Sequence, residues 1–219
     1  MRTRSLKIHI SDSIGEISAE VIEPENMKAM MVLAHGAGAG MSHPFLRTLS
    51  DELSSFGIGT LRYNFPYMEK GKKRPDVPAV AIKTVEQVVA KASTLFPDNA
   101  LILAGKSFGG RMSSHLLARH TPEVLKAIVF YGFPLHAVGK PGVERATHLI
   151  TIKVPMLFLQ GTKDDLAQVE LIKSVCDGLP SATLEFLEGA DHSFKIGKKD
   201  SIVDLSKKTN DWLVARNII

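Results

Sequence analysis

Apolar and polar residues alternate near the start of the chain and then give way to longer apolar runs. Residues 5–10 (SLKIHI) alternate strictly, which predicts a strand with one exposed face, and residues 15–24 predict its hairpin partner. Residues 27–36 (MKAMMVLAHG) form a continuous apolar run, which is typical of a strand buried on both faces. The pattern therefore predicts an antiparallel pair at one edge of a sheet, followed by a buried strand.

The rest of the chain alternates strand-like runs with segments of helical spacing. The expected strands are residues 58–65, 100–105, 125–132, 154–161 and 182–189, and the expected helices are residues 43–57, 77–97, 111–120, 166–179 and 201–216. Strands that alternate with helices form βαβ units around a parallel sheet. We therefore expect one α/β domain over residues 1–219, with a mostly parallel sheet of about eight strands and helices on both faces. The two longest connections, 64–78 and 132–153, are too short to form a separate lid domain.

Composition narrows the class of protein. The 219 residues are 44% hydrophobic and 23% charged, as in ordinary globular proteins, and no apolar run is long enough to cross a membrane. The net charge of +4 is mild, so we expect neither nucleic acid nor membrane as a partner. Cys176 is the only cysteine, which excludes an intrachain disulfide and a cysteine-based metal site. The first residues lack a secretory signal, so we expect a cytoplasmic protein, monomeric or homodimeric.

A serine between two glycines follows the apolar run of residues 100–105. Residues 105–109 (GKSFG) form a G-x-S-x-G pentapeptide between an expected strand and an expected helix. This is the setting of a nucleophile elbow, a sharp turn that presents the serine oxygen at the carboxyl end of the sheet. Gly105 and Gly109 would allow the close backbone approach that such a turn needs. The alternative is an ordinary turn in which Ser107 caps the helix, but the context favours Ser107 as a nucleophile.

Two later loops supply a base and an acid for this serine. A serine hydroxyl is a poor nucleophile unless a base takes its proton and an acid orients the base. In elbow sites the acid and then the histidine follow the serine along the chain. His192 follows the last expected strand, and Asp164 and Asp165 follow the strand before it. We favour Asp164 as the acid, because Asp165 is better placed to cap or begin the next helix. The prediction is a Ser107, His192 and Asp164 triad.

The remaining histidines are weaker candidates for the base. His35 ends a buried strand and is interpreted as a structural, hydrogen-bonding residue. The others considered lie in helices or loops and are interpreted as solvated or hydrogen-bonded: His43, His115, His120, His136 and His148. Asp191 precedes His192 directly, and an adjacent residue cannot easily face the same imidazole.

A glycine-rich loop, AHGAGAGMSHP, follows the third expected strand. Such a loop can aim backbone N–H groups at the oxygen of a substrate. We expect the N–H of Phe108 and the N–H of Ala37 to form an oxyanion hole, with Gly36 and Gly38 beside the substrate. The rival interpretation is a phosphate-binding loop, but the segment lacks both the G-x-G-x-x-G spacing and the lysine of a P-loop.

The motifs HGAGAG, GKSFGG, GTKDD and GADHSF, in this order, resemble those of an α/β-hydrolase of the dienelactone-hydrolase-like group. More narrowly, LAHGAGAGMSHPF, LRYNFPYMEKGKKRPD and AGKSFGGRMSSHLLA resemble the small KAN-type (testis-expressed-30-like) hydrolases. The resemblance covers nearly the whole chain. It implies the α/β-hydrolase fold, and the same triad and oxyanion donors. The shortness of the two longest connections adds that no large cap domain is expected. Dienelactone hydrolases proper carry a cysteine where this chain has Ser107, so their substrate does not transfer.

These features predict a serine hydrolase that cleaves an ester or thioester of a small molecule through an acyl-enzyme, with no metal or other cofactor. The alternative is a catalytically silent binding or scaffold protein on the same fold. The complete triad and glycine set favours the enzyme, because a retired site would not need to keep them. A transferase or a peptidase with the same triad also stays open, since a fold does not determine its substrate.

The connection 64–78 is expected to shape substrate preference. Phe65 and Tyr67 come first and are apolar enough to line a pocket wall. The basic residues follow and would form a cationic rim that attracts acidic substrates: Lys70, Lys72, Lys73 and Arg74. The alternative is that this basic run is a solvated loop.

Overall fold

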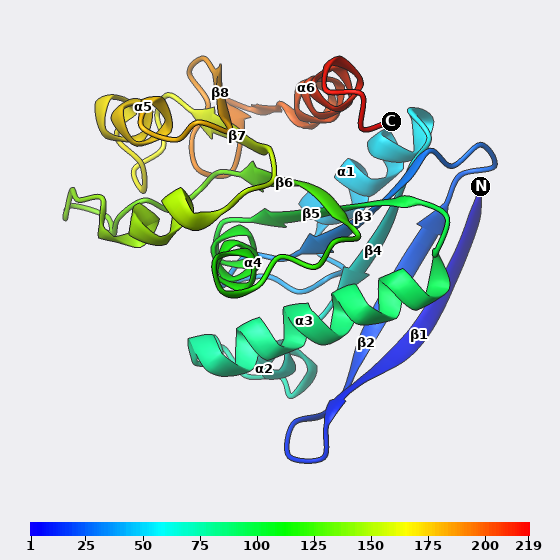
Figure 1. Cartoon of the computed structure of the whole chain (residues 1–219). Coiled ribbons are helices and arrows are strands. Elements are labelled where there is room, and N and C mark those ends of the chain that lie inside the picture. Colours follow the sequence, from blue (N-terminus) through cyan, green and yellow to red (C-terminus); the bar gives the residue numbers. More distant parts are fainter.

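An eight-stranded sheet runs through the molecule (Figure 1). The structure is a computed structural model and describes residues 1–219. The strand order is β1-β2-β4-β3-β5-β6-β7-β8. The strands are β1 (Arg2–Ser11), β2 (Gly15–Glu23), β3 (Ala29–Ala34), β4 (Ile58–Tyr63), β5 (Ala100–Lys106), β6 (Leu125–Tyr131), β7 (Met156–Gly161) and β8 (Ala182–Leu187). β1 and β2 pair antiparallel with each other, β2 pairs antiparallel with β4, and all neighbours from β4 to β8 are parallel. The predicted mostly parallel sheet with an antiparallel edge is confirmed.

Helices cover both faces of this sheet. They are α1 (Pro44–Ser55), α2 (Pro66–Glu69), α3 (Pro78–Leu95), α4 (Phe108–Arg119), α5 (Val169–Asp177) and α6 (Ile202–Ala215), with a 3₁₀-helix η1 (Glu144–Thr151) and a small hairpin of β9 (Lys195–Ile196) and β10 (Lys199–Asp200). α1 and α6 pack on one face, and α3, α4 and α5 pack on the other (Figure 1).

The continuous apolar runs follow from this layering. Side chains alternate between the two faces of a strand, so a strand with helices on both sides must be apolar throughout. In β3, Met30, Val32 and Ala34 belong to the core under α3 and α4, whereas Met31 and Leu33 belong to the core under α1 and α6. The sheet therefore separates two hydrophobic cores.

The expected elements are all present, with corrections at their ends. α4 begins directly after Ser107, three residues earlier than expected, so two glycines fall in its first turn. α5 begins at Val169 with Gln168 as its N-cap residue, so Asp165 neither caps nor begins this helix. The connections 64–78 and 132–153 contain only the short α2 and η1, and no large cap domain is present.

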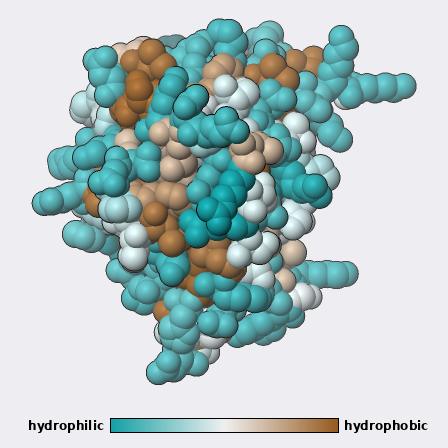
Figure 2. Space-filling view, turned by 90° about the vertical axis from the view of Figure 1, so that its right-hand side faces the viewer, coloured by the Kyte–Doolittle hydropathy of each residue, from teal (hydrophilic) through white to brown (hydrophobic).

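The side of the molecule that lies to the right in Figure 1 is mostly hydrophilic, with apolar residues exposed between the hydrophilic ones in the middle of the face and near its top (Figure 2). Both chain ends lie on this side (Figure 1). None of the helices combines the length and the apolar character that crossing a membrane requires.

Candidate active site

The turn between β5 and α4 is a strained elbow centred on Ser107. Ser107 has φ of 50°, in the left-handed region that a residue with a side chain rarely adopts. A Cβ on Gly109 would lie 2.6 Å from the carbonyl oxygen of His35, and a Cβ on Gly105 would collide with the backbone of Gly109 and Gly110. Both glycines are therefore sterically required, because the elbow presses the start of α4 against the ends of β3 and β5. Strain of this kind is characteristic of functional sites.

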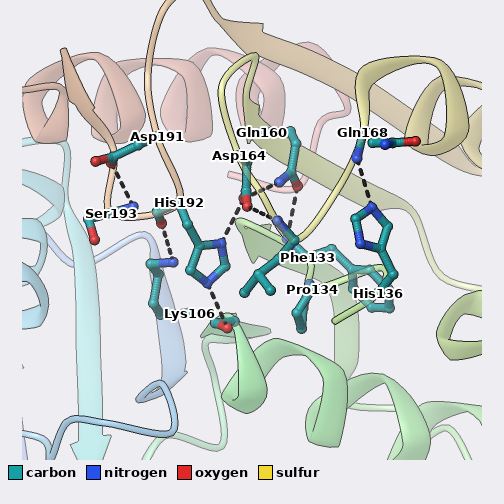
Figure 3. Close-up of polar contacts among 12 residues, drawn as sticks. Lys106, Phe133, Pro134, His136, Gln160, Asp164, Gln168, Asp191, His192 and Ser193 are labelled. Carbon is teal, nitrogen blue, oxygen red and sulfur yellow. Dashed lines mark hydrogen bonds and ion pairs between the residues drawn. The ribbon is translucent and has the colours of Figure 1, made fainter. Parts of the chain in front are cut away.

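The three predicted triad residues meet at the carboxyl edge of the sheet. The Nε2 atom of His192 lies 2.9 Å from Ser107 Oγ, and its Nδ1 atom lies 2.7 Å from Asp164 Oδ2 (Figure 3). A carboxylate can only accept, so Asp164 holds the ring proton on Nδ1. Nε2 is then free to accept the serine proton, which is the arrangement that nucleophilic catalysis requires.

Buried polar groups hold the acid in place. The side chain of Asp164 is fully buried, and its Oδ1 accepts from the backbone N–H of Leu166 at 2.8 Å. Gln160 donates through Nε2 to Asp164 Oδ2 at 2.5 Å and accepts at Oε1 from the N–H of Phe133 at 2.9 Å (Figure 3). Asp165 is exposed and makes no side-chain hydrogen bond. Gln160 was not predicted, although an amide at the end of a buried apolar strand is a signal for such a role.

Lys106 is a second residue that the sequence analysis did not single out. Its Nζ donates to the backbone oxygen of His192 at 2.6 Å (Figure 3). The same atom lies 5.3 Å from the ring centroid of Phe194. Burial lowers the pKa of Lys106 to about 8, while the charges of Asp164 and Asp191 raise it. The lysine thus ties the loop that carries the imidazole to the end of β5. Its position inside the G-x-S-x-G pentapeptide, at the end of a buried strand, was the available signal.

Asp191 shapes the same loop rather than facing the imidazole. Its Oδ1 accepts from the N–H groups of Ser193 at 2.8 Å and Lys195 at 3.0 Å. Asp191 therefore supports the turn after His192, which agrees with its exclusion as the triad acid.

The glycine-rich loop after β3 passes close to the nucleophile. A Cβ on Gly36 would lie 3.8 Å from Ser107 Cβ. His35 Nδ1 lies 2.8 Å from the oxygen of Gly36, and the hydroxyl of Tyr67 donates to the oxygen of Ala37 at 2.8 Å. Because the N–H and C=O of a trans peptide point in opposite directions, the N–H groups of Ala37 and Gly38 face away from these two rings.

The amide of Phe108 is the other expected donor. Phe108 is the first residue of α4, where a backbone N–H has no acceptor within the helix. The positive end of the helix dipole lies at the same place. Both features favour negative charge beside Ser107.

A cavity of about 400 Å³ opens beside Ser107. It is lined by Gly36, Ala37, Gly38, Ala39, His43, Phe45, Leu46, Lys106, Ser107, Leu166, His192 and Ser193. We call it the Ser107 cavity. The glycine-rich loop, the start of α1 and the His192 loop thus enclose the serine on one side. Gly36 and Gly38 line the cavity, and their contact with substrate stays a prediction.

Phe65 and Tyr67 do not line this cavity, contrary to the expectation. Both side chains are buried, at 0% and 1% exposure. The ring of Phe65 packs edge-on against His35 at 4.9 Å and Phe108 at 5.3 Å between centroids. These aromatic residues are apolar enough to form a cluster beneath the glycine-rich loop, so they support the loop from below instead of meeting the substrate.

The basic run of the same connection does not line the cavity either. Lys70, Lys72, Lys73 and Arg74 are exposed, and none of them lines the Ser107 cavity. The expected cationic rim is therefore not formed there, because α2 closes the chain against the body and leaves the run at the tip of the loop.

His35 is structural, as expected. It is fully buried, and its Nε2 accepts from the N–H of Phe65 at 3.0 Å. Burial lowers the pKa of His35 to about 4, partly offset by its hydrogen bond to Gly36, so the ring is neutral at pH 7. No group of three or more His, Cys, Asp or Glu side chains is placed to hold a metal ion.

Comparison with known proteins agrees with this architecture. Residues 27–215 match the family described as Alpha/beta hydrolase domain. The chain is 32% identical over 117 residues to a proline iminopeptidase of Thermoplasma volcanium, a match that covers 52% of this chain and 37% of that protein. The chain therefore spans little more than a third of that relative's length.

Solved structures show the same fold over the whole chain. An alpha-beta serine hydrolase homologue from Coxiella burnetii superposes with a TM-score of 0.76 at 20% identity, covering 100% of this chain and 99% of the other. A dienelactone hydrolase from Anabaena variabilis superposes with a TM-score of 0.79 at 17% identity, covering 98% and 97%. The narrower resemblance to KAN-type hydrolases is not among these findings and stays a prediction.

Proposed function

We propose that this chain, which belongs to the alpha/beta hydrolase domain family, is a serine hydrolase that cleaves an ester or thioester of a small molecule through an acyl-enzyme. The observation that carries the proposal is the unbroken chain of hydrogen bonds from Ser107 through His192 to the buried Asp164. A serine, an imidazole and a carboxylate in this geometry, beside a cavity, are suited to acyl transfer.

In the first half of the reaction, Ser107 Oγ attacks the carbonyl carbon while His192 Nε2 takes the serine proton. The N–H groups of Phe108 and Ala37 stabilise the oxyanion of the tetrahedral intermediate, and Asp164 stabilises the imidazolium. The imidazolium then gives its proton to the departing alcohol or thiol. The acyl group stays on Ser107.

Water completes the cycle. His192 takes a proton from a water molecule as the water oxygen attacks the acyl carbonyl, and the second tetrahedral intermediate collapses to the free acid. The proton returns to Ser107 Oγ, and no cofactor is needed at any step. The uncovered Ser107 cavity suits a small substrate and leaves water access to the acyl-enzyme.

A peptidase is the second candidate, because the partial match to a proline iminopeptidase covers about half of the chain. Amide and ester hydrolysis use the same residues and differ in the leaving group. A panel of aryl esters of increasing acyl length beside aminoacyl arylamides separates the two. Turnover of the arylamides with no turnover of any ester would replace the esterase assignment by a peptidase.

A fluorophosphonate probe tests the nucleophile directly. The wild-type protein should be labelled at neutral to mildly basic pH, and Ser107→Ala should lose all labelling. Ser193→Ala is the matched control, since Ser193 lines the same cavity and should not be needed for labelling. Labelling that survives Ser107→Ala would place the nucleophile elsewhere. A folded wild-type protein that takes no label would favour the catalytically silent alternative.

A further inference from the structure

Four basic side chains gather on α4 and η1, on residues that do not line the Ser107 cavity. We call Arg111, His115, Arg145 and His148 the α4–η1 cluster. The rings of His115 and His148 stack with their centroids 3.7 Å apart, which joins the two elements. None of the four side chains forms an ion pair with a carboxylate.

Arg111 lies one helical turn from the nucleophile. Its N–H donates to the carbonyl oxygen of Ser107 at 3.1 Å. Side chains of a helix lean toward its N-terminus, and the i and i+4 positions lie on the same face, so Arg111 belongs to the face of α4 that begins at Ser107. Its side chain is half-buried and makes no hydrogen bond or ion pair within the protein. Five N–H donors of a guanidinium near the reacting serine are therefore unused.

Arg145 approaches the same place from η1. Its Nη1 donates to the backbone oxygens of His136 at 2.9 Å and Pro134 at 3.4 Å. These residues follow β6, whose last residue, Tyr131, accepts from the N–H of Ser107 at 3.2 Å. Arg145 is thus held against the segment that follows β6, the strand whose end is hydrogen-bonded to the elbow. The neighbouring carboxylate of Glu144 rests against Gly142 instead of Arg145.

The two arginines carry the charge of the cluster. Ser114 donates its hydroxyl proton to the oxygen of Arg111 at 2.8 Å, so it accepts from Nε2 of His148 at 2.7 Å. Burial and then the charges of His115 and Arg111 lower the pKa of His148 to about 4, so that ring is neutral at pH 7. Burial and then the charge of Arg145 also lower the pKa of Arg111. Like charges thus face each other here with no acid between them.

We propose that Arg111 and Arg145 bind an anionic group of the substrate, a carboxylate or a phosphate, so that the enzyme prefers esters that carry such a group a few bonds from the scissile carbonyl. This inference rests on the proposed hydrolase function. An ester has two substituents, and the Ser107 cavity receives one while the α4–η1 cluster meets the other. An anion relieves the repulsion between the guanidinium groups and occupies the unused donors of Arg111, with the geometry that guanidinium and oxyanions share.

The kinetic test compares charged and neutral versions of one substrate. One pair places the carboxylate on the acyl side, as the p-nitrophenyl half-ester of glutarate and its methyl-capped analogue. The other pair places it on the alcohol side, as meta-acetoxybenzoate and its methyl ester. The ratio of kcat/KM, charged over neutral, should exceed one in at least one pair and should fall about 10- to 100-fold in Arg111→Gln, as expected for charge-assisted hydrogen bonds. Using a ratio removes any difference in the active fraction.

Arg119→Gln is the matched control, because it removes the same charge from the same helix. Arg119 is exposed and lies eight residues beyond Arg111, about 12 Å further along α4. Its ratio should stay within about twofold of the wild type, since exposed charges at such distances are screened by salt. Equal losses in both variants, or a ratio that Arg111→Gln leaves unchanged, would overturn the proposal.

A binding measurement separates the subsite from the catalytic assignment. Ser107→Ala protein, which cannot form an acyl-enzyme, is titrated by calorimetry with monomethyl glutarate and with inorganic phosphate. The titrations are repeated on the double variant that carries both Ser107→Ala and Arg111→Gln. Binding that the second substitution weakens about tenfold or more supports the subsite even if no ester is hydrolysed. Tighter binding of one probe identifies carboxylate or phosphate as the natural group. Failure of both probes to bind would refute the subsite while leaving the triad in place.

Discussion

Two charged loops leave the same edge of the sheet and end in opposite environments. Residues 162–168 follow β7, and residues 64–78 follow β4. In the first loop, the carboxylate of Asp164 is fully buried and accepts hydrogen bonds from Gln160, Leu166 and His192. In the second, the buried part is aromatic, and the charged run stays at an exposed tip. The comparison shows that a charged side chain reaches the active site only when it is buried and hydrogen-bonded there. A position in a loop at the carboxyl edge of the sheet is not sufficient.

The largest effect should come from the first loop, where two neighbouring aspartates are each replaced by asparagine in separate variants. Asp164→Asn keeps the shape of the side chain but favours the wrong imidazole tautomer, so kcat for ester hydrolysis should fall by about 10⁴-fold. Asp165→Asn should change kcat less than about twofold, because the exposed Asp165 contacts no triad residue. Steady-state kinetics on both variants measure the contrast. A larger loss in Asp165→Asn would reverse the assignment of the acid.

The buried His35, which follows β3 and holds the start of the second loop, should make the stability of the protein depend on pH. His35 accepts from the N–H of Phe65, and burial lowers its pKa to about 4 from an ordinary 6.5. As the pH falls below 6.5, the unfolded chain takes up the proton first, so this contribution to stability is lost between pH 6.5 and pH 4. Between pH 7 and pH 5, the wild type should lose about 2 kcal/mol more unfolding free energy than His35→Gln.

Urea unfolding at the two pH values measures this difference, and His120→Gln, at an exposed position, serves as the control that should keep the wild-type pH dependence. The change in free energy between pH values, rather than its absolute value, is compared, because His35→Gln also alters packing. Equal pH dependence in all three proteins would contradict a buried neutral His35. An NMR titration that shows the ring of His35 ionising near pH 6.5 would do the same.

The smallest effect should come from the exposed tip. Replacing Lys70, Lys72, Lys73 and Arg74 together by Gln removes four charges, yet none of these residues lines the Ser107 cavity. We expect kcat/KM to stay within about twofold for both acidic and neutral esters, as is usual for surface substitutions. A loss of kcat/KM for acidic esters alone, which becomes smaller as the salt concentration is raised, would support the cationic rim. The basic run would then act on acidic substrates as Arg111 is proposed to do.

The fold was predictable because its signals are local and periodic. The continuous apolar run at β3 required helices on both faces, and the alternating run at β1 required an exposed edge. The start of α5 was misplaced because Asp165 is an acceptable cap by composition. In the structure the carboxylate of Asp164 turns the chain by bonding the N–H of Leu166, which delays the helix. Either aspartate could form such a local turn, and Asp164 is the one that also bonds Gln160 and His192 from other parts of the fold.

The sequence by itself determined the order and the positions of the triad candidates. Parallel strands end at one edge of a sheet, so Ser107, Asp164 and His192, each placed after a strand, had to come near one another. Only the tertiary structure decided which side chains meet there. That Gln160 bridges Asp164 to Phe133, that Lys106 holds the His192 loop, and that Tyr67 lies beneath the glycine-rich loop depend on segments far apart in the chain. The physical reason is that periodicity reports burial along one element, whereas a hydrogen bond depends on how separate elements pack.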